Sequence, residues 1–257
     1  MSKDLIIGVH SIAEALMNPK RHEKKIYGTE DSVKDLKKSY KHLLDFGGSV
    51  KIELFTNNHK FQQHSERIYA EYGHKFQRIP GNILLEASHV PFVQIGSLFD
   101  RLKDSSGMRL LCLDQVTDPQ NAAAILRTAS FYGVDSIIMP GKSSTGFSPG
   151  FFRVSSGAAE HVNIFVVSNL SRFVSRFNEL GGHSIGFSEH SEEKLLDDKL
   201  EKDQNILLVL GNEEKGISNA VSRQVSSFTS LKTQGKIHSL NVSVAAAVAM
   251  EKFFKAK

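Results

Sequence analysis

The chain has very little cysteine, no tryptophan and no long apolar run. Its single cysteine, Cys112, lies inside the apolar segment 110–113, which excludes a disulfide framework and a multi-cysteine metal site. No apolar run approaches the length of a membrane span. The N-terminus carries Asp4 close behind Lys3 without a long apolar core, so no secretory signal is expected. We therefore expect a protein of the reducing cytoplasm with no membrane partner.

Length and charge set the next limits. The 257 residues suit one large domain or two modest ones, and we favour two. The 32 basic and 28 acidic side chains leave a net charge of +4, which is compatible with a polyanionic partner without requiring one. Charge alone therefore does not identify a function.

Motifs of three common enzyme classes are incomplete. Residues 146–150 match the G-x-S-x-G pattern of serine hydrolases, but Pro149 follows the serine and has no N–H for an oxyanion hole. Residues 141–143 resemble the end of a phosphate-binding loop, but Ser136 stands where that loop needs glycine. The eleven histidines contain no close metal-ligand pair, so we expect no metal.

Residues 1–85 are typical of a small α/β domain. A short helix is predicted after His10 and Ser11 and should stop at Asn18-Pro19. A second helix is predicted from Asp31-Ser32 to Gly47-Gly48, and strands are predicted at 24–27 and 50–55. The second helix has a basic face, for which solvation is the simple explanation and RNA binding the functional one: Lys34, Lys37, Lys38 and Lys41.

Residues 86–105 read as a linker with some helix, and residues 106–257 as a second domain. Strands are predicted at 109–113, 135–139, 163–167, 183–187 and 206–210, with a weaker one near 227–231. Helices lie between most of them. Apolar strands that alternate with helices indicate a parallel sheet covered on both faces, whose ligands bind beyond the carboxyl ends of the strands.

Three stretches lie at such strand ends: 118–129 opens a helix, 207–218 is a buried strand that ends in a glycine-bounded polar turn, and 239–248 is a loop that leads into the final helix. In this order they resemble the motifs of the SpoU (TrmH-like) ribose methyltransferases of the SPOUT superfamily. The resemblance covers about residues 106–257 and implies a trefoil knot at the C-terminal end, S-adenosylmethionine as the methyl donor and RNA as the substrate. Residues 7–16 also resemble the start of the ribosomal-protein-like RNA-binding domain that many SpoU enzymes carry.

The resemblance implies a set of site residues. Those expected to be catalytic are Asn121, Arg127, Glu213, Ser239 and Asn241. Those expected around the cofactor are Leu210, Gly211, Leu231, Leu240 and Asn241. The chain has Leu231-Lys232-Thr233 where the family usually has Ile-Pro-Met, and Ala123 where glycine is usual. A further family segment that lines the site matches Ser155, Ser156, Gly157 and Ala158, with Arg153 as a possible phosphate contact.

Arg127 is assigned the activation of the ribose hydroxyl in the family. A guanidinium is effectively always protonated, so we prefer a role in which Arg127 holds a phosphate and stabilises developing alkoxide charge. Gly211 lacks a Cβ and could allow a close approach of the backbone to the cofactor.

The expected function is thus methylation of a ribose 2′-hydroxyl, with large-subunit ribosomal RNA as the favoured substrate. A tRNA ribose methyltransferase and a non-catalytic RNA-binding or ribosome-assembly factor of the same fold remain as alternatives. A homodimer is also expected, partly from the resemblance and partly because the final helix has more small and apolar residues than one packing face requires: Ala245, Ala246, Ala249, Phe253 and Phe254. Burial in the chain's own core is the simpler explanation for these five.

Overall fold

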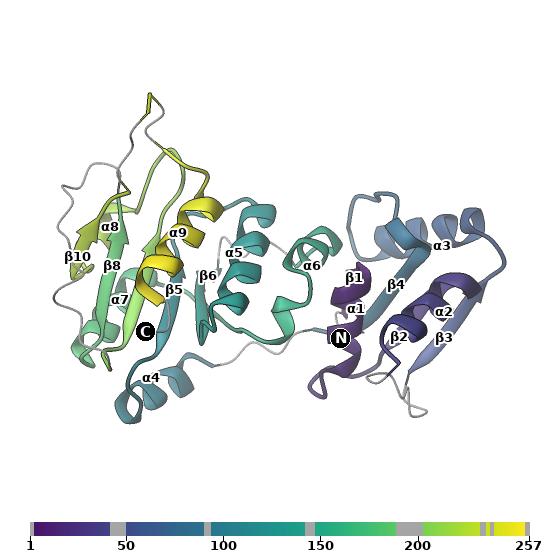
Figure 1. Ribbon diagram of the computed structural model, residues 1–257, viewed down its shortest axis with the longest axis horizontal. Coiled ribbons are helices and arrows are strands. Elements are labelled where there is room, and N and C mark those ends of the chain that lie inside the picture. The colour runs from purple at the N-terminus through teal and green to yellow at the C-terminus, as the bar shows by residue number, and fades with distance from the viewer. Residues whose placement is uncertain are drawn as a thin grey trace. The chain divides into compact units, whose positions relative to one another are not determined.

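The computed structural model describes residues 3–41, 50–89, 94–141, 147–188, 203–231, 235–236 and 239–254. Contacts within the chain divide it into two compact units (Figure 1). The first unit contains residues 1–91 and also residues 146–161, and the second contains residues 92–145 and 162–257. A segment from the later part of the sequence therefore belongs to the N-terminal unit.

The first unit is built on a mixed four-stranded sheet. Its strands lie in the order β1 (Lys3–Ile7), β4 (Ile83–Ser88), β2 (Lys25–Thr29) and β3 (Lys51–Phe55). β4 is antiparallel to both of its neighbours, and β2 and β3 are parallel. The chain forms α1 (Val9–Met17), α2 (Glu30–Ser39), α3 (Asn58–Glu71) and the short η1 (Pro80–Asn82) between these strands.

Two helix starts differ from the sequence prediction. α1 begins at Val9, so His10 and Ser11 lie inside it, and Gly8 enters the helix with a φ of 92°, which favours glycine. The buried Ser11 does not cap the helix. α2 begins at Glu30, one residue before the predicted start, because the Thr29 side chain accepts from the backbone N of Ser32. The predicted continuation of this helix to Gly47-Gly48 is wrong at its start, since α2 ends at Ser39 with Tyr40 as its C-cap, and residues 42–49 lie outside the described residues.

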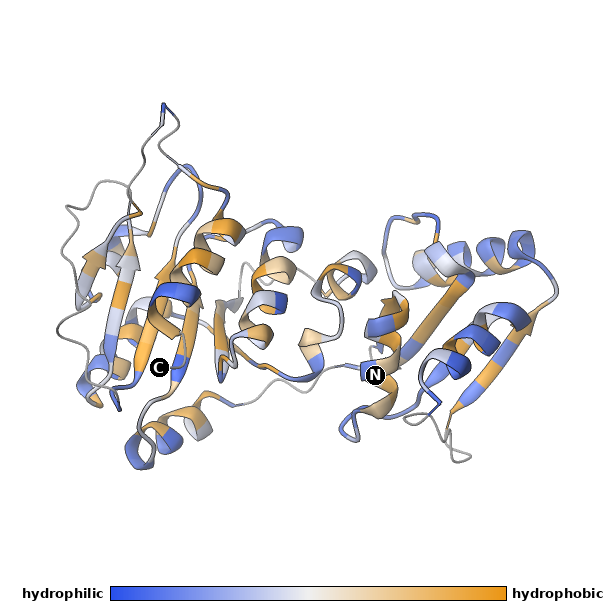
Figure 2. Ribbon diagram, in the orientation of Figure 1, coloured by the Kyte–Doolittle hydropathy of each residue, from blue (hydrophilic) through white to orange (hydrophobic). Residues whose placement is uncertain are grey.

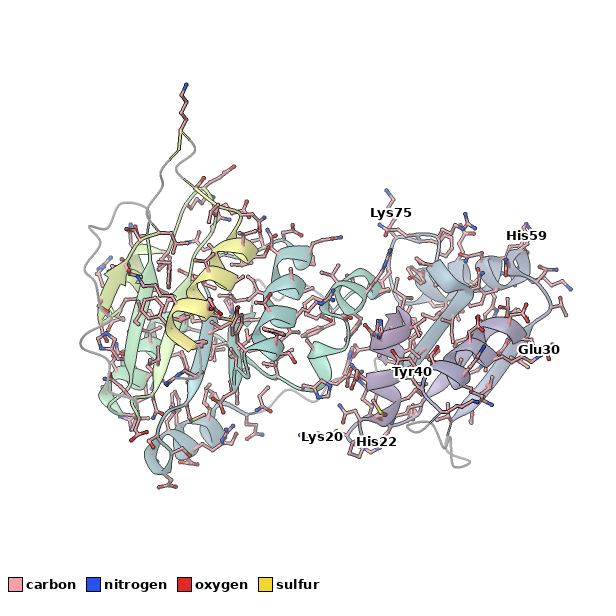
Figure 3. The ribbon with its side chains drawn as sticks, in the orientation of Figure 1. Lys20, His22, Glu30, Tyr40, His59 and Lys75 are labelled. Carbon is pink, nitrogen blue, oxygen red and sulfur yellow. The ribbon has the colours of Figure 1, made fainter. Side chains whose placement is uncertain are left out.

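The outer surface of the first unit is charged. Lys34 on the basic face of α2 forms an ion pair with Glu30 at 2.8 Å, and both side chains are exposed. Glu30, His59 and Lys75 extend away from the unit into solvent (Figure 3). Contact with solvent and an ion pair within α2 therefore account for part of the basic face without an RNA partner.

The late segment of the first unit contains α6 (Pro149–Ser155) and η3 (Ala158–Glu160), which pack on β1 and α1. A fully buried Arg21 joins it to the N-terminal residues, with Nη1 2.7 Å from Asp4 Oδ2 and Nη2 2.7 Å from Glu160 Oε1. Asn18 Nδ2 donates to Glu160 at 2.7 Å, and Ser11 Oγ donates to the Phe152 carbonyl at 2.6 Å. Because buried charges are costly unless paired, this arrangement specifies where residues 147–161 dock.

The second unit contains a six-stranded parallel sheet. Its strand order is β10 (Ser227–Thr229), β8 (His183–Phe187), β9 (Ile206–Leu210), β5 (Arg109–Leu113), β6 (Ser136–Pro140) and β7 (Asn163–Val167). Every neighbouring pair is parallel. The predicted parallel sheet and its strands are confirmed, with β6 displaced by one residue and β10 ending two residues before the end of the predicted strand.

Helices cover both faces of this sheet. α4 (Ile95–Asp104), α7 (Leu170–Glu179) and α8 (Asn219–Ser222) share one core with alternate strand residues such as Leu110 and Cys112. α5 (Pro119–Phe131) and α9 (Val242–Phe254) pack against each other on the other face (Figure 1). β9, β5, β6 and β7 are mostly apolar, as expected for strands buried on both sides, whereas β8 and β10 at one edge of the sheet are more polar (Figure 2).

Several residues of interest have structural roles. Ser148 of the hydrolase-like motif is the N-cap of α6 and accepts from the Phe151 backbone N at 3.2 Å. Cys112 is completely buried, and burial raises the pKa of its thiol, so it stays protonated at neutral pH.

No helix within the described ranges is long and apolar enough to cross a membrane.

Candidate active site at the carboxyl edge of the parallel sheet

Three polar side chains from distant parts of the sequence meet beyond the carboxyl ends of β5 and β9. Asn121 lies in the first turn of α5, Glu213 follows β9, and Asn241 immediately precedes α9. Glu213 Oε1 accepts from Asn121 Nδ2 at 3.1 Å and from Asn241 Nδ2 at 2.8 Å. Asn241 Nδ2 also donates to Asn121 Oδ1 at 3.0 Å. We call these three residues the polar cluster.

The polar cluster forms at the start of a helix. Glu213 Oε1 also accepts from the backbone N of Val242, the first residue of α9, at 3.0 Å. Asn241 Oδ1 accepts from the backbone N of Ser243 at 2.9 Å, so Asn241 caps α9. A carboxylate at this position is stabilised by the partial positive charge of the helix N-terminus.

The two carboxylate oxygens of Glu213 differ in their contacts. Oε1 takes part in three hydrogen bonds, whereas Oε2 has no hydrogen-bond partner in the part of the chain that the structure describes. The side chain is therefore held at one oxygen and presents the other to solvent or a ligand. This arrangement can accept a hydrogen bond from a hydroxyl or amino group without giving up its own supports.

The loop that carries Glu213 is held by its own backbone. Asn212 and Gly216 exchange two backbone hydrogen bonds of 2.9 Å. A Cβ on Gly211 would come within 2.2 Å of the Gly216 carbonyl carbon, so this turn itself explains why glycine stands at position 211. The sequence argument from close approach of a cofactor is not needed for that residue.

Two supporting residues were missed by the sequence prediction. The buried Asp114 accepts from the backbone N of Ser218 at 2.6 Å, and the carbonyl of Gln115 accepts from Asn212 Nδ2 at 3.2 Å. Gln115 has a φ of 59°, in the left-handed region. Both residues directly follow the predicted strand 109–113, and a polar residue at the carboxyl end of a strand was the signal available in the sequence.

The other predicted catalytic residues do not join the polar cluster. Arg127 lies six residues after Asn121 on α5, about 9 Å further along and about 120° away around the helix axis. Its side chain is exposed and has no hydrogen-bond or ion-pair partner among the described residues. Ser239 is likewise exposed, with no partner in the described ranges. The structure thus gathers three of the five residues.

The predicted cofactor residues are distributed around the same edge. Leu210 is buried at the end of β9, Leu231 is half-buried after β10, and Leu240 is 49% exposed beside Asn241. Lys232 and Thr233 lie outside the described residues. Ala123 is completely buried in α5, where its methyl group is accommodated. Residues 155–158 belong to the first unit, where Arg153 is exposed.

A parallel sheet with polar side chains gathered at its carboxyl edge is typical of α/β proteins that bind small molecules at this edge. A model of the SpoU rRNA Methylase family matches residues 108–251, more than half of the chain. The chain belongs to this family.

Comparisons with individual proteins agree. A Staphylococcus aureus (strain COL) protein named as a TrmH family tRNA/rRNA methyltransferase is 32% identical over 154 residues, which is 60% of this chain and 61% of that protein. The chain thus matches about three-fifths of the length of this relative. The SpoU methyltransferase AviRb from Streptomyces viridochromogenes, solved with the cofactor AdoMet, has a TM-score of 0.72 and 18% identity, covering 97% of this chain and 88% of that one.

A second solved structure, an RNA 2′-O ribose methyltransferase, has a TM-score of 0.66 and 18% identity. The similarity covers 97% of this chain and 87% of that chain. At this identity the two structures show a common fold across both units.

Proposed function

We propose that this protein transfers a methyl group from S-adenosylmethionine to a ribose 2′-hydroxyl of RNA, and that its substrate is large-subunit ribosomal RNA. The observation that carries the proposal is the polar cluster, in which residues of three separate motifs form one hydrogen-bonded group. Family membership supports the reaction. The chain shares its fold with AviRb over both units, so an additional N-terminal domain is available for binding the substrate. We propose that this first unit binds structured RNA.

The described residues fit the proposed cofactor. Leu240 is a large aliphatic side chain exposed next to Asn241, and Leu231 is half-buried at a neighbouring loop. Exposed apolar side chains together with the carboxylate of Glu213 suit a nucleoside, which has apolar ring faces and polar edges. Leu210, Gly211, Leu231, Leu240 and Asn241 would hold it. When bound, S-adenosylmethionine supplies an electrophilic methyl group. The trefoil knot of the C-terminal end is part of this proposal.

The residues of the chain would act mainly by positioning and by charge. The ribose 2′-oxygen would take the methyl group, S-adenosylhomocysteine would be the leaving group, and the hydroxyl proton would pass to a phosphate oxygen or to water. Arg127 is proposed to hold the adjacent phosphate and to stabilise charge on the ribose oxygen. Holding two reactants in line supplies about 7–11 kcal/mol in the best cases, so ordered binding accounts for much of the rate.

We also propose that the protein is a homodimer, on different residues from those expected. Four of the five expected residues, Ala246, Ala249, Phe253 and Phe254, are buried in the chain's own core, and the fifth, Ala245, is half-buried. The exposed apolar residues of this layer are instead Phe131 (83% exposed), Leu240, Val244 (48%) and Val248 (42%).

We infer that these residues share one outer surface. α5 and α9 run side by side in the same direction, because Asn121 and Asn241 meet at their starts and Tyr132 donates to Glu251 at 2.9 Å near their ends. Arg127 lies one turn before Phe131 on the same side of α5. A second copy that covers this surface would receive Arg127 into the interface, which explains why Arg127 is remote from its own polar cluster.

The test of the function uses the whole protein and two measurements. Calorimetry with S-adenosylhomocysteine should show binding, which Asn241→Ala weakens because it removes the cap of α9. Transfer of a labelled methyl group should then be measured on total RNA from cells that lack the gene, and the label should appear in a 2′-O-methyl nucleotide of large-subunit ribosomal RNA.

Each other outcome selects an alternative. Label in tRNA would make the protein a tRNA ribose methyltransferase. Binding of RNA without binding of S-adenosylhomocysteine and without transfer would make it a non-catalytic RNA-binding or ribosome-assembly factor.

A further inference from the structure

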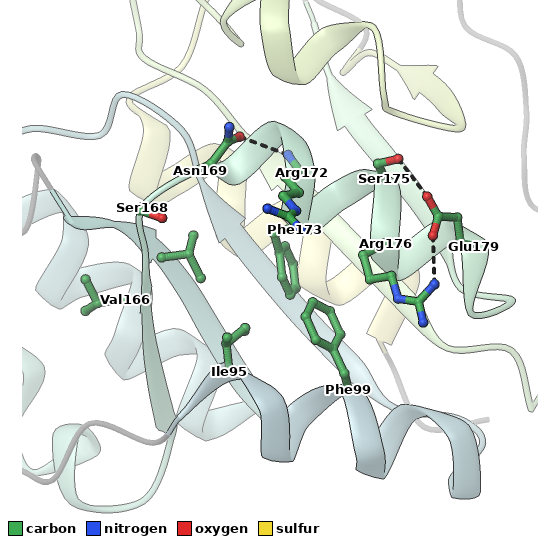
Figure 4. Close-up of a pocket in the computed structure, with 11 residues that line it drawn as sticks. Ile95, Phe99, Val166, Ser168, Asn169, Arg172, Phe173, Ser175, Arg176 and Glu179 are labelled. Atoms are coloured by element: carbon green, nitrogen blue, oxygen red, sulfur yellow. Dashed lines mark hydrogen bonds and ion pairs between the residues drawn. The ribbon is translucent and has the colours of Figure 1, made fainter.

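A groove of about 740 Å³ lies in the second unit between α4, α7 and the end of β7 (Figure 4). Its volume is in the range of natural ligand sites. α4 and α7 share the core on one face of the sheet, whereas α5 and α9 cover the other face. The groove is therefore separate from the polar cluster and from the proposed dimer surface.

The floor of the groove is apolar and aromatic. Phe99 of α4 and Phe173 of α7 are stacked, with ring centroids 5.7 Å apart and an angle of 24° between the rings. Phe173 is buried, but Phe99 and Ile95 are only half-buried. The stack thus fixes the orientation of a ring that still presents surface to the groove. Such a ring is a platform on which a nucleobase can stack.

The wall formed by α7 is basic. Arg172 and Arg176 lie one helical turn apart, and Arg176 forms an ion pair with Glu179 at 2.8 Å. The guanidinium of Arg172 is exposed and has no hydrogen-bond or ion-pair partner in the described part of the chain. At the same end of the groove, next to the N-terminus of the ten-residue helix α7, the Ser168 hydroxyl and the Asn169 side-chain N–H groups have no hydrogen-bond partner among the described residues. These donors suit a phosphate group.

The position of the groove relates it to the reaction. All six strands are parallel, so the end of β7 at Val167 lies at the same edge of the sheet as the ends of β5 and β9. β7 is two places from β5, which corresponds to about 10 Å along the edge at a strand spacing of about 4.8 Å. A strand of RNA whose target nucleotide lies at the polar cluster needs only a few more nucleotides to reach this groove.

We propose that the groove binds single-stranded RNA next to the target nucleotide, with a base stacked on Phe99 and a backbone phosphate held by Arg172. This inference rests on RNA being the substrate. An apolar peptide is the competing occupant. It is disfavoured because the basic wall would leave Arg172 without an anionic partner.

The experiment compares two charge reversals in the full-length protein. Arg172→Glu removes the proposed phosphate contact, and Glu at the third position of a helix is favourable, so the variant should fold. Lys103→Glu on α4 makes the same change in charge outside the groove, at a lysine whose only described partner is Asp100. Binding of an eight-nucleotide oligouridine is measured by fluorescence anisotropy over a range of salt concentrations.

Arg172→Glu should weaken oligouridine binding at least fivefold and lower the slope of log affinity against log salt by about 1. Lys103→Glu should stay within twofold of the unchanged protein. Phe99→Leu should weaken binding with no change in slope, because it removes stacking and no phosphate contact. Equal effects of the two charge reversals would overturn the proposal.

Crosslinking locates the RNA directly. An oligouridine that carries 4-thiouridine should crosslink to peptides from residues 95–104 or 168–179. If the crosslinks fall only in other regions, or if Arg172→Glu does not weaken RNA binding, the groove has another occupant, such as a peptide. These readouts need no methyl transfer, so RNA binding in the groove can stand if the proposed reaction fails. Equally, transfer can be present while the groove proposal fails.

Discussion

Glu213 combines the support of a helix with a position at the proposed active site, and a substitution can measure the first of these. Its Oε1 caps the first backbone N–H of α9 and holds two asparagines. Both asparagines and the helix start would lose an acceptor in a Glu213→Ala variant, whereas the neighbouring Glu214 has no side-chain partner in the described structure.

We expect Glu213→Ala to lower the free energy of unfolding in urea by about 1–2 kcal/mol. Glu214→Ala should change the free energy of unfolding by less than about 0.5 kcal/mol. If the two substitutions have the same effect, the hydrogen bonds of the polar cluster do not stabilise the fold.

Arg127→Ala should abolish methyl transfer while leaving the affinity for S-adenosylhomocysteine nearly unchanged. The reason is that Arg127 has no contact with the polar cluster of its own chain and is assigned to the RNA side of the reaction. Single-turnover transfer and calorimetry measure the two effects. A rate within about tenfold of the unchanged protein, or about 1.4 kcal/mol in activation free energy, would show that the assigned role is wrong.

Tyr69 gives the protein a sensitivity to alkaline pH. Burial raises the pKa of its hydroxyl to about 12, and the hydroxyl has no partner within the described residues. The unfolded chain loses this proton near pH 10 while the folded chain keeps it, so stability is fully present below about pH 10 and falls as the pH rises toward 12. Urea unfolding at pH 9 and pH 11 should show a smaller loss in Tyr69→Phe than in the unchanged protein. An identical loss in both would assign the pH dependence to other groups.

At the scale of single residues, the sequence predicted which polar side chains would gather but not all of them. Asn121, Glu213 and Asn241 follow strands or open helices at one edge of a parallel sheet, so the periodicity and the family motifs place them together. Asp114 and Gln115 were missed because their contacts depend on how the loop after β9 folds back, which no local pattern records.

Among the elements, the strands were the easiest to predict. Buried parallel strands are continuous apolar runs, and five of the six in the second unit were predicted to within one residue. Helix starts were less predictable. At α1 the residues that look like caps lie inside the helix because Ser11 bonds to the distant Phe152 carbonyl. The docking of α6 and η3 on the first unit was not predicted, since the ion pairs of Arg21 join residues far apart in the sequence.

The contact between η3 and α1 can be tested at Gly157. A Cβ there would come within 2.5 Å of Glu14 Cγ, and the residue has a φ of +91°. Gly181 has a similar φ of +85° with nothing within 4 Å of its Cβ position. Both Gly→Ala substitutions carry backbone strain of about 1–3 kcal/mol, but only Gly157→Ala displaces Glu14 from its 2.8 Å contact with His161.

Gly157→Ala should therefore lower the melting temperature by several degrees more than Gly181→Ala. Equal shifts would mean that the first unit tolerates a displaced η3, in which case the fit against α1 is not what fixes this segment.

At the scale of the whole molecule, the proposed dimer depends on the exposed apolar residues of α9, Val244 and Val248. Val248→Glu would bury a charge in the interface and should give a monomer in sedimentation velocity experiments at micromolar concentration. Leu54→Glu is the matched control, because Leu54 is 55% exposed on β3 of the first unit and should leave the dimer intact. A dimer that persists in Val248→Glu, or an unchanged protein that is already monomeric, would contradict the proposal.

Residues 146–161 belong to the first unit although they follow residues 92–145 of the second, and this order has a consequence for synthesis on the ribosome. The polypeptide up to residue 91 emerges well before the piece that completes its fold, which is about seventy residues further along. At about 5–20 residues per second the nascent first unit waits about 4–14 s, with Arg21 lacking Glu160 throughout. The N-terminal unit therefore cannot complete its fold until residue 161 has been synthesised, by which time residues 92–145 of the second unit have also been made.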